Sequence, residues 1–210
     1  KGIKGTKFSA VFSTNAPVNW LSLARVFLFG ARDVWFVVGI PIYFYSVWSD
    51  GTEAGNKAAF FLIGSFMALW IIFYGFVQAF APKFLAKSPV QSASGLALAL
   101  ALVPLALSGL VWADVAGLTA ILIAGLLLFG AVFALNSALH SYLILRITTQ
   151  ARVTMDVGFY YMANATGRLI GTVLSGLSYQ MGGLVACLLC AGVMLLLSAL
   201  AARRLPVTSL

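Results

Sequence analysis

Long apolar stretches alternate with short polar links along this chain. Each apolar stretch is about as long as a helix that crosses a bilayer. The six stretches lie at residues 19–47, 57–81, 94–112, 117–145, 155–179 and 184–202. The pattern predicts an all-α membrane protein, a bundle of six transmembrane helices over residues 19–202. Residues 1–18 are predicted to be a cytoplasmic loop or linker, and residues 203–210 a cytoplasmic tail.

Composition supports the membrane assignment. Hydrophobic residues make up 62% of the 210 positions and charged residues only 9%, with a mean hydropathy of +1.03. A soluble domain of this length does not need so much apolar surface. The net charge of +8 is better explained by basic membrane loops than by nucleic-acid binding. The polar start lacks the apolar core of a cleavable signal peptide, so we expect it to be a loop.

The loop charges predict the orientation. Counted alternately, the loops on one side carry nine basic residues: Lys1, Lys4, Lys7, Lys83, Lys87, Arg146, Arg152, Arg203 and Arg204. The other side carries Lys57, together with Asp50, Glu53 and Asp114. Because basic residues collect on the cytoplasmic side of a membrane, both termini are predicted to be cytoplasmic. The expected location is the inner (plasma) membrane, with multiple crossings.

The first apolar stretch contains three charged residues, Arg25, Arg32 and Asp33. A charge at the bilayer centre costs at least about 2.5–3.5 kcal/mol. Arg25 is close enough to the helix start to extend to the interface, whereas Arg32 is about 20 Å along the helix, near mid-membrane. Two interpretations stay open. The arginines either form a structural ion pair with a neighbouring helix or line a water-filled path as an anion site, in which Asp33 tunes Arg32 or carries a coupling proton.

The fifth stretch repeats this pattern with Tyr161, Asn164 and Arg168, which are three and four residues apart and so share one helix face. Such a set of hydrogen-bond donors suits an oxyanion such as phosphate or carboxylate. The alternative is that Arg168 pairs with Asp33 and only fixes the packing. Small residues spaced about one helical turn apart allow close helix approach, so the nearby Gly167, Gly171 and Gly176 indicate packing.

Other polar residues in the apolar stretches have simpler interpretations. Asn136 and His140 are four apart on one face; His140 is expected to be packed or hydrogen-bonded, with a proton relay or substrate contact as the alternative. Asp156 is expected to be an acid at a helix N-terminus rather than a coupling group. Cys187 and Cys190 form a lone C-x-x-C inside an apolar run, which indicates packing thiols rather than a metal or redox site.

Several segments resemble a known family. The stretches NWLSLARVFLFGARDVWFVVGIPIYF, FGAVFALNSALHSYLI and DVGFYYMANATGRLIGTVLSGLSYQMGGLVAC resemble the organoarsenical-efflux permeases of the major facilitator superfamily. The likeness covers most of residues 19–202, and the two arginine-bearing motifs are its specific part. It implies that the chain corresponds to the second six-helix half of a twelve-helix fold. The third and sixth helices, which lack charges, would then be peripheral.

The resemblance also implies a function. The family exports an arsenophosphoglycerate, a multiply anionic ester, and so confers resistance to arsenate. This chain would then be the C-terminal half of a secondary-active permease, with the bilayer and an N-terminal six-helix half as partners, and with no enzyme activity, cofactor, metal or nucleic acid expected. The alternative is a facilitator for another anionic or organic small molecule. The predicted substrate-binding residues are Arg32, Arg168, Arg25, Tyr161, Asn164, Asn136 and His140, with Asp33 in a coupling or ion-pair role.

Two other classes of protein are less consistent with the sequence. An intramembrane serine protease needs an activated serine near His140, and neither Ser108-Gly109 nor Ser175-Gly176 has the required G-x-S-G form. A membrane scaffold without transport activity would predict no water access at Arg32.

Overall fold

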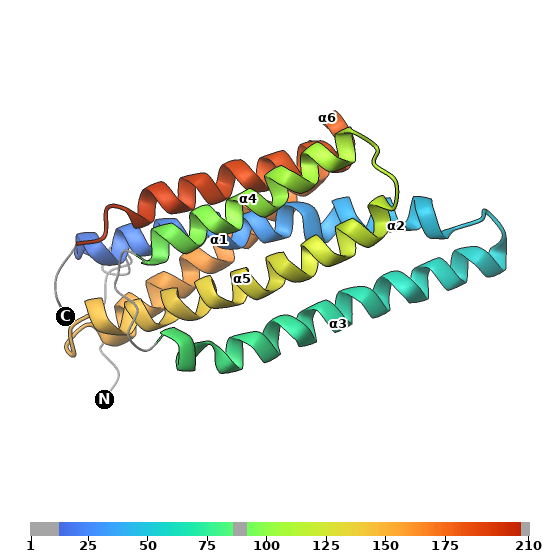
Figure 1. Cartoon of the computed structure of the whole chain (residues 1–210). Helices are drawn as coiled ribbons and strands as arrows, with labels where there is room; N and C mark the ends of the chain where they lie inside the picture. Colours follow the sequence, from blue (N-terminus) through green and yellow to red (C-terminus); the bar gives the residue numbers. More distant parts are fainter. Residues whose placement is uncertain (1–12, 86–91, 207–210) are drawn as a thin grey trace.

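The computed structural model describes residues 13–85 and 92–206, and every regular element in these ranges is a helix. Figure 1 shows the helices side by side in one bundle, with α1 beginning and α6 ending at the same end. The elements are α1 (Ala16–Val34), the π-helix η2 (Trp35–Gly39), α2 (Ile40–Trp48), α3 (Glu53–Leu85), α4 (Ser92–Trp112), α5 (Leu118–Ile147) and α6 (Val153–Ala202). The first twelve residues, which hold most of the predicted leading loop, lie outside the described ranges, as do the last four residues of the predicted tail.

Five helices in the described ranges are long and apolar enough to cross a membrane. The chain is therefore an all-α bundle of multi-pass membrane type. The prediction of six separate helices is wrong in its count, because the expected fifth and sixth helices are parts of α6, which has 50 residues. At about 1.5 Å per residue, a straight α6 would be about 75 Å long, more than twice the thickness of the hydrocarbon core.

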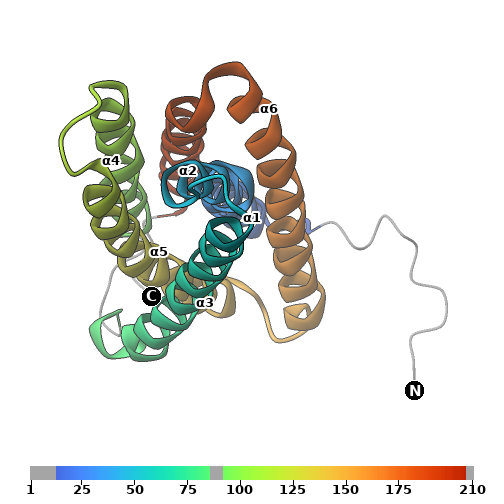
Figure 2. The same cartoon turned by 90° about the vertical axis from the view of Figure 1, so that its right-hand side faces the viewer.

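A break at Gly182 and Gly183 folds α6 back on itself (Figure 2). Gly183 has φ 60° and ψ −150°, a conformation that is accessible essentially only to glycine. Both arms then reach the same part of α1. Gly167 on the first arm lies against the Val26 backbone, and Ser198 on the second arm donates a 2.8 Å hydrogen bond to the carbonyl of Ala24.

The first span runs without interruption from Ala16 to Trp48, close to the predicted 19–47. The span contains a π-helical turn, Trp35–Gly39, in which the Ile40 amide bonds the Trp35 carbonyl. Pro41, in the first turn of α2, has no N–H to continue the regular ladder. The Val38 amide, within the π-helical turn, donates to Ser175 Oγ of α6 at 3.1 Å. The widened turn is thus tied to a neighbouring helix.

Aromatic side chains fill the core between η2, α3 and α5. Trp35 packs edge-on against Trp70 and Phe129 at ring-centroid distances of 5.4 and 5.2 Å. The Trp70 indole donates to the Leu126 carbonyl at 2.8 Å, so its buried N–H has a partner.

α3 is the least enclosed helix. Within the apolar 18-residue segment that could cross a membrane, only 6% of α3 is buried, against 39% of α4. The side chains of Phe61 and Phe84 on α3 are 75% and 76% exposed. The sequence instead indicated the third and sixth stretches as the outer supports. Those stretches, α4 and the second arm of α6, pack against each other, as shown by the contact of Gly192 with Leu105. Their lack of polar groups made them look peripheral, although the equally apolar α3 has fewer neighbours.

Candidate functional site

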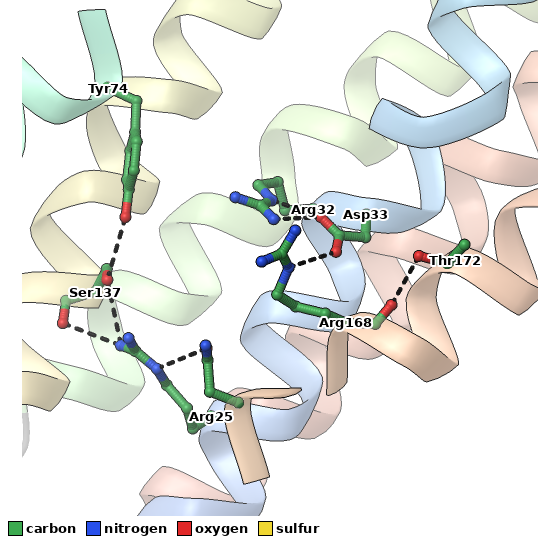
Figure 3. A network of polar contacts seen from close by, with 8 residues as sticks. Arg25, Arg32, Asp33, Tyr74, Ser137, Arg168 and Thr172 are labelled. Atoms are coloured by element: carbon green, nitrogen blue, oxygen red, sulfur yellow. Dashed lines mark hydrogen bonds and ion pairs between the residues drawn. The ribbon is translucent and has the colours of Figure 1, made fainter. Parts of the chain in front are cut away.

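Two arginines share one buried carboxylate at the centre of the bundle (Figure 3). Arg32 Nε donates to Asp33 Oδ1 at 2.6 Å, and Arg168 Nε donates to Asp33 Oδ2 at 3.1 Å. The Asp33 side chain is only 3% exposed. Arg32 and Asp33 come from α1 and Arg168 from α6, so the predicted ion-pair geometry between these helices is present.

The two arginines of this cluster differ in access. The Arg32 side chain is 12% exposed and its guanidinium lies 5.6–5.8 Å from the ring centroids of Phe29, Phe36 and Phe133. The Arg168 side chain is 57% exposed, and its terminal amino groups have no partner among the described residues. Arg168 therefore presents unused donors at the edge of a buried ion pair.

Arg25 forms a second cluster on the same face of α1, two turns nearer the helix start. Its Nε donates to Asn164 Oδ1 at 3.2 Å, and one terminal nitrogen donates to the carbonyl and the hydroxyl of Ser137 at 3.1 and 3.2 Å. The residue is 4% exposed. The expectation that Arg25 extends to the membrane interface is therefore wrong: partners on α5 and α6 bind its guanidinium inside the bundle.

Aromatic rings complete the Arg25 environment. The guanidinium carbon lies 3.9 Å from the ring centroid of Phe29 and 4.9 Å from that of Tyr160, close enough for cation–π attraction. Tyr74 on α3 donates a long, 3.5 Å hydrogen bond to Ser137 Oγ. Sequence reasoning missed Ser137, Tyr74 and Phe29 because these residues are common in apolar helices. The available signal for Ser137 was its position between Asn136 and His140.

The antiparallel packing of α1 on α5 sets which residues meet. Asn15 donates to the Ile147 carbonyl at 3.0 Å, Arg25 bonds Ser137, and the Phe29 and Phe133 ring centroids lie 5.0 Å apart. The two residue numbers add up to the same total in each pair, which is the signature of one constant antiparallel register. The seven-residue spacing of Arg25 and Arg32 then places both on the side of α1 that faces α5 and α6.

The glycines of α6 allow its close approach to α1. A Cβ at Gly167 would overlap the Val26 backbone, and one at Gly171 would overlap the Gly30 backbone. This contact brings Asn164, three residues before Gly167, to Arg25. It also brings Arg168, the residue after Gly167, to Asp33. The prediction that these glycines serve packing is confirmed for Gly167 and Gly171, whereas Gly176 has open space around it.

The structure brings together only part of the predicted set. Tyr161 is 56% exposed and contacts the ring of Tyr160 at 5.5 Å. Asn136 and His140 are fully buried on α5, and neither bonds the arginines. The Asn136 amide donates to the Val132 carbonyl of its own helix, while its oxygen and both His140 nitrogens have no hydrogen-bond partner among the described residues.

The remaining predicted residues lie away from both clusters. Asp156 is in the first turn of α6, as expected, and accepts hydrogen bonds from Ser13 and Thr148 at 2.8 Å each. Cys187 and Cys190 are free thiols. Cys187 is buried and packs against Gly39. Within the described ranges, no group of three or more His, Cys, Asp or Glu residues is placed to hold a metal ion.

The chemistry of the combined site is cationic. Three guanidinium groups and one carboxylate lie within the apolar part of the bundle, which leaves two positive charges there. The fold and this site define a helical membrane protein with an internal cationic centre. No family model, curated protein or solved structure matches the chain.

Proposed function

We propose that this chain is the C-terminal six-helix half of a secondary-active efflux permease of the major facilitator type. Its substrate is an anionic organoarsenical, arsenophosphoglycerate, whose export confers arsenate resistance. The two arms of α6 each cross the membrane, which gives six crossings, and both termini are cytoplasmic in the inner membrane. The sequence resemblance and the loop charges support these assignments.

One observation carries the proposal: Arg168 is 57% exposed beside a buried carboxylate that also binds Arg32. A carboxylate with two arginines leaves one positive charge, so an entering oxyanion meets net attraction. The forked guanidinium can bind such an anion through two parallel hydrogen bonds. Charges at this depth are costly and usually mark a transport path or its partners.

The described contacts give each residue a role in the proposal. Arg168 binds the anion directly, and Arg32 binds it by exchanging its bond to Asp33 for one to the substrate. Tyr161 and Asn164, on the same face of α6 as Arg168, orient the ligand. Arg25 is enclosed by its own partners, so it supplies positive potential rather than a first contact.

Asn136 and His140 are the least supported members of the predicted site. Both are fully buried and neither bonds the arginines, so contact with substrate requires a different arrangement of α5. Facilitators work by rocking two bundles around a site at the midplane. The N-terminal half supplies the second bundle and, in this proposal, the opposite wall of the site.

The alternative, a facilitator for another anionic or organic small molecule, is supported by the same observation. Nothing in a cluster of guanidinium groups distinguishes arsenate from phosphate, because both are tetrahedral oxyanions. The full-length protein with both halves is the form in which to compare them.

The test is export from cells challenged with arsenate, normalised to folded protein in the membrane. Arg32→Ala and Arg168→Ala are expected to lower export per folded molecule, whereas Arg203→Ala, at the basic end of α6, is expected to leave it unchanged. Normal export in both site variants would overturn the anion site. Export of phosphoglycerate in place of the arsenical would favour the alternative.

A further inference from the structure

A cavity of about 390 Å³ lies between α3 and α5, at the end of the bundle where both helices finish. Its volume falls within the range of small-molecule sites. Apolar surface dominates its wall, which is formed mainly by Gln78, Pro82 and Leu85 of α3 and by Ala138, Tyr142 and Leu145 of α5. The arginine clusters do not line it, so it is separate from the proposed anion site.

Basic side chains mark this end of the bundle. Arg146, next to Leu145, is exposed, and its guanidinium carbon lies 5.0 Å from the ring centroid of Tyr142, a residue of the cavity wall. Lys83 follows Pro82 and is also exposed. In the described ranges the acid at this end is Asp156, which is buried and already hydrogen-bonded to Ser13 and Thr148. A negative group at the cavity mouth therefore meets uncompensated positive charge.

Two donors in the wall have no hydrogen-bond partner among the described residues. These are the side-chain amide of Gln78 and the hydroxyl of Tyr142. Ser141 also borders the cavity, but its hydroxyl already donates to the Ser137 carbonyl at 2.9 Å. The cavity thus combines an apolar wall, two donors without a partner among the described residues, and basic side chains at its mouth. A ligand with an apolar body, ester oxygens near its polar end and a negatively charged headgroup would match all three.

We propose that this cavity binds an anionic phospholipid of the cytoplasmic leaflet. One acyl chain occupies the apolar space between α3 and α5, the Gln78 and Tyr142 donors serve the glycerol esters, and Arg146 binds the phosphate headgroup. Basic pockets between helices on the cytoplasmic side are known to take such headgroups. The inference rests on the orientation given under Proposed function, but it does not depend on transport or on the substrate.

Two other hollows on α3 provide an internal contrast. One is bordered by residues such as Phe66, Phe76 and Leu127, and the other by Pro41, Ile42 and Phe60. Charged residues line none of the three hollows among the described residues, but only the cavity between α3 and α5 has an arginine packed on a residue of its wall, Tyr142. The other two suit acyl chains of any lipid, whereas the cavity beside Arg146 also selects the headgroup charge.

Native mass spectrometry of the purified full-length protein tests the assignment. Phosphatidylglycerol and phosphatidylcholine with identical acyl chains are added separately, and the retained lipid is counted. Wild type is expected to retain more phosphatidylglycerol. Arg146→Gln is expected to reduce that retention about fivefold, the effect of one basic residue on binding to anionic lipid. Arg203→Gln, which removes an exposed charge from the same end, is the matched control and should retain as much as wild type.

A second arm tests the acyl-chain site. Ala138→Phe fills the cavity and is expected to lower retention of both lipids. If this variant does not fold, Leu145→Gln replaces it, because Leu145 is an apolar residue of the cavity wall at a 62% exposed position. Three results would overturn the proposal: equal retention of the two lipids by wild type, equal losses in Arg146→Gln and Arg203→Gln, or unchanged retention in the cavity variant.

Discussion

The three intramembrane arginines differ in how they are held. Arg25 donates to Asn164 and Ser137 through two of its nitrogens, Arg32 is paired with Asp33 among aromatic rings, and Arg168 shares that carboxylate from an exposed position. The same residue type can thus serve structure at one position and ligand binding at another, and substitutions separate these roles.

Arg168→Lys keeps the charge but loses the planar fork that binds an oxyanion through two bonds. We expect markedly weaker export from Arg168→Lys and none from Arg168→Ala, at nearly normal amounts of folded protein. Folding is preserved because Asp33 keeps Arg32 as a partner. The measurement is export by the full-length protein per folded molecule. A lysine variant that exports normally would show that only charge matters at this position.

Asp33 is the residue whose loss should damage folding. Removing one member of a buried ion pair costs about 3–5 kcal/mol, since a charge stays behind without its partner. Asp33→Asn leaves two arginines unneutralised, so the amount of folded protein in the membrane should fall. The double variant Asp33→Asn with Arg168→Gln should recover part of it. No recovery would mean that the two residues are not energetically coupled.

Arg25→Ala is expected to harm stability more than Arg168→Ala. The sequence alone favours a mild effect, because Arg25 is near the helix start. In the structure, its removal leaves the Asn164 oxygen without a donor, at about 1–3 kcal/mol for an unpaired group, and takes one of two side-chain donors from the buried Ser137 carbonyl, which keeps the Ser141 hydroxyl. Thermal unfolding in detergent gives the comparison, with Arg25→Lys as the matched variant. Equal unfolding temperatures for the two alanine variants would contradict this ranking.

At the scale of elements, the closest contact is between α1 and the first arm of α6. Gly171→Ala places a methyl group against the Gly30 backbone, which cannot move as a flexible side chain can. We expect a loss of about 1–3 kcal/mol, typical of overpacking, and a lower thermal midpoint. Gly176→Ala, on the same helix with open space around it, should leave the midpoint unchanged. Similar midpoints for both variants would argue against the tight α1–α6 packing.

For the whole molecule, the charge bias and the broken α6 make a joint prediction about topology. Reporter fusions after Gln150 should read cytoplasmic, and fusions after Gly51 and Ala113 should read external. A fusion after Gly182 distinguishes one crossing by α6 from two. An external signal there supports two crossings, joined at the glycine break. A cytoplasmic signal at Gly182 would contradict the six-crossing arrangement.

The sequence by itself determined the class of fold and the location of the unusual charges. Runs of apolar residues about 20 long predict membrane helices regardless of their neighbours, because each helix satisfies its own backbone hydrogen bonds. The first four predicted stretches agree closely with the first four membrane-length helices of the structure. The spacing of Arg25 and Arg32, and of Asn164 and Arg168, also placed each pair on one helix face, since helical periodicity is a local property.

Only the tertiary structure decided which groups pair. The register between α1 and α5 decides that Arg25 bonds Ser137. The glycine contacts between α1 and α6 decide that Arg168 reaches Asp33 and shares it with Arg32. Hydropathy gave no sign that α3 is more exposed than α4, because both are apolar and burial depends on neighbours. The cavity beside Arg146 likewise follows from how helices meet, which local periodicity does not encode.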